Sequence, residues 1–88
     1  MAASEPIWTV AAESDFRILK PASDEIDGVM FHLEKALNDP TIGHPVLFKL
    51  LEDKDFRITN WGRFVILFLR NAGSVKVIKV LQYPDQYR

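Results

Sequence analysis

The sequence predicts an α+β domain in which a small antiparallel sheet is covered on one face by helices, in the order β-α-(α)-β-β-β. Apolar residues recur at helical spacing in the first half of the chain, which predicts an amphipathic helix. Short apolar runs separated by turn-forming residues fill the second half, which predicts neighbouring strands. Because the chain has 88 residues, it suits one domain with a single core.

The composition is that of an ordinary globular protein, with 48% hydrophobic and 26% charged residues. There is no cysteine, which excludes a disulfide framework and a thiolate zinc site. Residues 1–6 lack the basic start and apolar centre of a signal peptide, so we expect a flexible tail there and a single domain over residues 7–88. The longest apolar run, residues 64–69, is far shorter than the roughly 20 residues of a membrane span. We therefore expect a cytoplasmic protein without a membrane partner.

The net charge of −1 divides unevenly along the sequence. Residues 1–55 carry five basic and eleven acidic side chains, a net charge of −6. Residues 56–88 carry six basic side chains and one acidic one, a net charge of +5. This division indicates a basic surface suited to nucleic acid or an acidic peptide. The alternative is that lysine and arginine keep strand ends soluble and discourage edge pairing.

The first half of the chain predicts a strand followed by a helix. Residues 7–12 form a short β-rich run that we expect to be the first strand, whereas the structure of residues 14–22 stays open. Ser23 is a predicted N-cap, because Asp24 and Glu25 follow it in the first helical turn. The helix is expected to end near Asn38, because Pro40 disfavours helical geometry at Asp39. The apolar stripe of this helix consists of Ile26, Val29, Met30, Leu33 and Leu37.

The second half predicts a three-stranded meander. We expect a loop over residues 41–45 and a short helical turn over residues 46–51. Strands follow at residues 56–59, 63–70 and 75–81, separated by the turn sequences NWG and NAGS. The nearly continuous apolar character of residues 63–70 predicts a central strand in the sheet.

Strand geometry divides this central strand into two faces. We expect one face, which carries Phe64, Ile66 and Phe68, to pack on the helix. The predicted partners on the helix are Ile26, Met30, Leu33 and Leu37. The opposite face is expected to carry Arg63, Val65, Leu67 and Leu69.

Few residues have the spacing of a catalytic or metal site. His32 and His44 lie twelve residues apart without cysteine, so neither a metal nor another cofactor is expected. Basic and aromatic residues of the C-terminal part can instead hold phosphates and stack on unpaired bases. The candidates for nucleic-acid or partner binding are Arg57, Arg63, Lys76, Lys79, Tyr83 and Arg88. The alternative is that Tyr83 packs over the sheet edge and Tyr87 closes the end of the chain.

The order of these segments resembles the RelE/ParE toxin superfamily of bacterial toxin-antitoxin systems. The resemblance covers an opening strand that ends near SDF, a helix ending in LEKALNDP, the linker TIGHP, then FRITNWGRFVILF and VKVIKVLQYPDQY. It implies a helical pair on an antiparallel sheet. It also implies a type II toxin that a cognate antitoxin neutralises, and that acts by messenger RNA cleavage on the ribosome or by ParE-like binding of DNA gyrase. The alternative is a degenerate, non-catalytic interaction module of the same fold.

The resemblance also bears on catalysis. Ribonuclease members carry arginine after the aromatic residue of a Gly-x-aromatic-Arg motif, and that position holds Val65 here. Valine supplies no positive charge to stabilise a phosphate in the transition state. If the chain is an endoribonuclease, Arg63 is the expected phosphate-stabilising residue, and Tyr87 is the expected stacking or proton-transfer group. The positions after the last strand, often basic in the family, hold Gln82, Tyr83 and Pro84.

Overall fold

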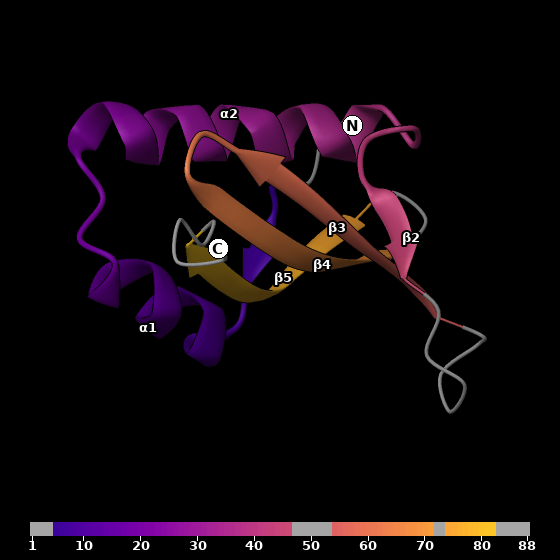
Figure 1. The fold of residues 1–88 in the computed structure, drawn as a ribbon. Coiled ribbons are helices and arrows are strands. Elements are labelled where there is room, and N and C mark those ends of the chain that lie inside the picture. The colour runs from indigo at the N-terminus through magenta and orange to yellow at the C-terminus, as the bar shows by residue number, and fades with distance from the viewer. Residues whose placement is uncertain (1–4, 47–53, 72–73, 83–88) are drawn as a thin grey trace, which may run out of the picture.

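A computed structural model of the protein describes residues 5–46, 54–71 and 74–82 (Figure 1). Two helices and five strands make up this part of the chain. In chain order they are β1 (Ile7–Trp8), α1 (Val10–Ile18), α2 (Ser23–Asn38), β2 (His44–Val46), β3 (Asp55–Trp61), β4 (Phe64–Asn71) and β5 (Ser74–Gln82). Both helices pack against the sheet, so the predicted α+β class is confirmed.

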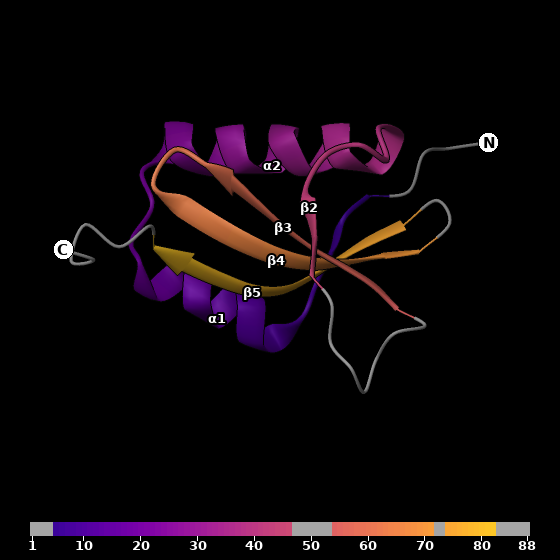
Figure 2. The same ribbon diagram turned by 45° about the vertical axis from the view of Figure 1, so that its right-hand side comes forward.

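The five strands form one sheet in the order β1-β5-β4-β3-β2. Strands β3, β4 and β5 make the predicted antiparallel meander, and β4 lies at the centre as expected. Strand β1 pairs with β5 in parallel, which the prediction of a wholly antiparallel sheet missed. Figure 2 shows α2 running along the three long strands and α1 lying beside β5.

The predicted first strand is wrong beyond Trp8, because helix α1 begins at Val10. Thr9 makes the transition: its backbone is extended, and its hydroxyl accepts a hydrogen bond from the Ala12 N–H at 3.1 Å. The same hydroxyl donates to the Val77 carbonyl at 3.0 Å. One side chain therefore caps α1 and fixes its start to β5.

Helix α2 ends at Asn38 as predicted, but Ser23 is its first helical residue rather than its N-cap. The N-cap position is taken by Ala22, which has no side-chain acceptor. Glu25 compensates by reaching back to accept the Ala22 N–H at 2.9 Å. This is the Glu half of a capping box, and it satisfies one of the unpaired donors at the helix start.

Strand β2 corrects the predicted loop over residues 41–45 and the helical turn predicted from Val46. His44, Pro45 and Val46 pair with β3, and Pro45 is tolerated because β2 is an edge strand. The rest of the predicted turn, residues 47–53, lies outside the described residues, as do residues 1–4 of the predicted tail.

The core lies between the helices and one face of the sheet. Phe64, Ile66 and Phe68 are fully buried on that face, which confirms the predicted alternation of β4. Both helices contribute to the same cluster, which consists of Ala12, Phe16, Val29, Leu33, Ala36, Phe64, Ile66, Phe68, Val75, Val77 and Val80. Leu33 and Leu37 pack there as predicted. Ile26 and Met30 do not, and instead line a pocket between the helices.

Candidate binding face

The side of the sheet opposite the helices is apolar and partly exposed. The register places Phe56 beside Leu69, Ile58 beside Leu67, and Val65 between Asn60 and Leu81 on this side. We call it the open face and define it by Ile7, Phe56, Ile58, Asn60, Val65, Leu67, Leu69, Lys76, Lys79 and Leu81. Ile58, Leu81 and Ile7 are 37%, 50% and 54% exposed. Exposed apolar side chains on neighbouring strands can mark an interaction site, which makes this face the candidate.

Two lysines of β5 give the open face its charge. Lys76 lies beside Leu69 and is exposed, and Lys79 lies beside Leu67. The Lys79 ammonium is 3.7 Å from a carboxylate oxygen of Asp15 on α1, and an ion pair this exposed holds its partners weakly. The residues that define the open face include no carboxylate. The face is therefore apolar with a positive edge.

Arg63 does not lie on the open face, contrary to the expectation that it shares a side with Val65. It belongs to the turn between β3 and β4, and its guanidinium makes two hydrogen bonds to the Glu25 carboxylate at 2.9 and 3.0 Å. It also donates to the Leu19 carbonyl at 3.2 Å and to Gln82 at 3.1 Å. The guanidinium carbon lies 4.5 Å from the centre of the Phe64 ring. Each of the three guanidinium nitrogens thus has a partner within the fold.

The Arg63 ion pair shifts the titration of both partners. Hydrogen bonds from Arg63, and then from the Ala22 N–H, lower the pKa of Glu25 to about 2. The Glu25 carboxylate correspondingly raises the pKa of Arg63. Both groups stay charged at neutral pH, so the pair persists there.

Arg57 is also used within the fold. It donates to the Asp55 carboxylate at 3.0 Å and to the carbonyl oxygens of Pro40 and Gly43 at 2.9 and 3.3 Å. Its side chain is 19% exposed and holds the segment between α2 and β2 against β3. Of the predicted binding residues that the structure describes, Lys76 and Lys79 lie on the open face. Tyr83, Tyr87 and Arg88 lie outside the described residues.

Sequence reasoning did not anticipate the two residues that organise the ends of α2. Glu25 holds Arg63 at one end, and Arg70 donates to the carbonyls of Ala36 and Leu37 at the other. The position of Glu25 in the first helical turn signalled a dipole interaction rather than an ion pair. An arginine near the C-terminal carbonyls of a helix is a recognised stabilising contact, but nothing local to Arg70 indicates which helix it meets.

In the described part of the chain, no group of three or more His, Cys, Asp or Glu residues is placed to hold a metal ion. Neither of the two described helices is long and apolar enough to cross a membrane. No protein-family model matches the sequence, and a search of the curated proteins gives no match.

Proposed function

We propose that this protein is a cytoplasmic toxin of a type II toxin-antitoxin pair, of the RelE/ParE kind, and that it acts by binding its target. Its cognate antitoxin docks an apolar, acidic segment on the open face. The resemblance of the segments after Pro6 to that superfamily supports the role of the protein. The helical pair on a mainly antiparallel sheet is the fold that this resemblance implies.

The open face is the observation that carries the binding proposal. Its apolar side chains on β3, β4 and β5 are partly exposed. A partner that covers these side chains removes apolar surface from water, which stabilises the complex. Lys76 and Lys79 border the apolar surface, whereas the exposed carboxylates Asp24, Asp27 and Glu34 lie on α2. An acidic partner is attracted to the lysine edge and repelled by the helices, so charge favours docking on the open face.

The surroundings of the arginines favour binding over RNA cleavage. Phosphate stabilisation needs donors aimed at the charge that develops in the transition state. Arg63 directs its donors at Glu25, Leu19 and Gln82, and Arg57 directs its donors at Asp55 and backbone carbonyls. Val65, in the position of the family's catalytic arginine, supplies none. A ParE-like target such as DNA gyrase therefore fits this chain better than messenger RNA on the ribosome.

Co-expression with any small acidic protein that is encoded beside this one tests the proposal. We expect the two proteins to co-purify, with an affinity that falls as salt rises. Ile58→Asp and Lys76→Glu should weaken the complex, because each places negative charge on the open face. Lys35→Glu reverses an exposed charge on α2 and is the matched control.

Two activity assays separate the mechanisms. Inhibition of DNA supercoiling by gyrase, relieved by the antitoxin, is the expected result. Incubation with translating ribosomes and mapping of messenger ends should show no cleavage. Cleavage that Arg63→Ala abolishes would show that the protein is a ribonuclease and would refute action by binding alone. Failure of every neighbouring small protein to form a complex would refute the toxin-antitoxin role.

A further inference from the structure

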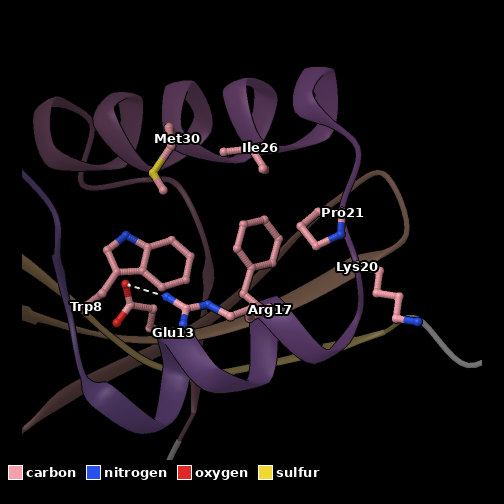
Figure 3. A pocket seen from close by; sticks show the side chains of 8 residues that line it. Trp8, Glu13, Arg17, Lys20, Pro21, Ile26 and Met30 are labelled. Carbon is pink, nitrogen blue, oxygen red and sulfur yellow. Dashed lines mark ion pairs between the residues drawn. The ribbon is translucent and has the colours of Figure 1, made fainter.

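A pocket of about 470 Å³ opens between α1 and α2, on the helical side of the molecule (Figure 3). Trp8 and Phe16 form one aromatic wall, with ring centres 5.4 Å apart. Ile26 and Met30 point into the pocket from α2 on the other side. Glu13 and Arg17 lie at its margin on α1. The site is thus an apolar cleft with one ion pair at the edge.

The pocket is closed at one end by the short, bent connection between the two helices, because Lys20 and Pro21 line it. Lys20 adopts a left-handed conformation with φ of 53°, and Pro21 follows it, so the chain turns sharply before α2 begins. The apolar stripe of α2 is wider than the part that the sheet covers. Ile26 consequently remains 36% exposed beside α1 instead of entering the core.

Arg17, at the margin of the pocket, can exchange its partner Glu13 for the anionic group of a ligand. The Arg17 guanidinium lies 3.4 Å from the Glu13 carboxylate, and their side chains are 78% and 62% exposed. An ion pair this exposed is worth little, so Arg17 can give up Glu13 for another anion at small cost. The aromatic and aliphatic walls contribute by burying the apolar part of the ligand.

We propose that this pocket binds a small amphiphilic monocarboxylate, with an aromatic or acyl body between the helices and its carboxylate on Arg17. The volume lies within the range of about 300 to 1,000 Å³ that is typical of small-molecule sites. Apolar walls with two exposed cations in the lining, Arg17 and Lys20, match this ligand in shape and charge. The site lies on the opposite side of the sheet from the open face, and it stands independently of the proposed toxin role.

Titration of the whole chain with phenylbutyrate, followed by heteronuclear NMR, tests the proposal. Two control probes have the same phenylbutyl body: phenylbutyramide is neutral, and phenylbutylamine is cationic. The indole N–H of Trp8 should shift on binding, whereas that of Trp61, which does not line the pocket, should shift less. We expect phenylbutyrate to bind about two- to fivefold more tightly than the amide, as one partly exposed ion pair predicts, and the amine to bind most weakly.

Two exposed variants should move the affinity in opposite directions. Arg17→Gln should lower the preference for the carboxylate, whereas Glu13→Gln should tighten phenylbutyrate binding because it releases Arg17. Ile26→Glu should abolish binding by placing a like charge inside the pocket. Lys35→Gln removes an exposed cation of α2 that does not line the pocket, and it is the control that should leave phenylbutyrate affinity unchanged.

Several results would overturn the assignment. Equal affinity for the three probes would remove the role of Arg17, and shifts confined to the open face would place binding elsewhere. Absence of saturable binding at millimolar probe concentrations would show that the pocket does not take this class of ligand. Shifts of Trp8 that depend on protein concentration without any probe would show that a second copy of the chain fills the pocket instead.

Discussion

Arg63 and Glu25 lie 38 residues apart in the sequence and are joined by a two-pronged ion pair, with hydrogen bonds of 2.9 and 3.0 Å. The pair links the turn between β3 and β4 to the first turn of α2. Because Arg63 also donates to the Leu19 carbonyl, the same side chain fixes the connection between the helices. A residue that the sequence suggested for phosphate chemistry thus secures the packing of the helices on the sheet.

Glu25 should give the protein an acid-sensitive component of stability. Its pKa is about 2 in the folded chain, against an ordinary value of 4.5. A lowered pKa stabilises the fold fully above pH 4.5, and this contribution is lost as the pH falls from there toward 2. Glu25→Gln should remove this component, as chemical denaturation over that pH range will measure. Asp24→Asn, an exposed change in the same helical turn, should keep the acid profile of the parent, and an unchanged profile for Glu25→Gln would contradict the prediction.

His32 should add a second dependence on pH, nearer neutrality. Its Nε2 lies 2.8 Å from the Thr59 hydroxyl, and burial, followed by the charge of Lys35, lowers its pKa. The His32 imidazole is therefore protonated at a lower pH in the folded chain than in the unfolded chain, where its pKa is about 6.5. The free energy of unfolding should fall as the pH drops below about 6.5, because the unfolded chain then binds more protons. Denaturant unfolding of His32→Gln should lack this fall. If the parent protein is equally stable above and below about pH 6.5, the prediction fails.

Gly28→Ala should destabilise the protein, although alanine is the better helix former. At an unhindered helical site the change would stabilise by about 1 kcal/mol. Here the Trp61 ring occupies the space that the new β-carbon needs, and overpacking of this kind costs about 1 to 3 kcal/mol. Thermal or denaturant unfolding measures the difference. Combining the change with Trp61→Leu should cost less than the two single changes added together, and strict additivity would show that the contact is unimportant.

Val65→Arg should leave the protein folded, because Val65 is only half-buried on the open face. Circular dichroism and denaturant unfolding provide the measurement. Ile66→Arg is the matched control: the neighbouring residue is fully buried against the helices, and an unpaired charge there should unfold the chain. Loss of structure in Val65→Arg would show that this position belongs to a packed interior. Gain of messenger cleavage by the folded variant would show that one residue separates this chain from a ribonuclease.

The parts of the fold that local pattern determines were predicted well. The stripe through Val29 and Leu33 located α2, and the turn sequences around residues 63–70 located the central strand. Thr9 was misjudged because a β-rich run of six residues outweighed its capping potential, although two alanines and Glu13 behind it favour a helix.

Pairing between distant residues could not be predicted from the same patterns. In β3 the register turns Arg57 and Thr59 toward the helices, while Phe56 and Ile58 lie on the open face. This inverts the usual expectation that apolar residues of an alternating strand face the core. The inversion depends on Asp55, Pro40 and Gly43 satisfying Arg57, and on His32 satisfying Thr59, which only the folded chain brings together.

The position of β5 has a consequence for synthesis of the protein. This strand is the last of the described elements, yet it lies between β1 and β4 and is the main support of α1. The Thr9 hydroxyl finds its carbonyl partner 68 residues later in the chain, at Val77. Contacts between residues so far apart in the sequence form late and slowly during folding. A nascent chain that has not yet emerged as far as residues 74–82 therefore lacks the partner of helix α1, so the apolar side of this helix stays exposed until those residues have been synthesised.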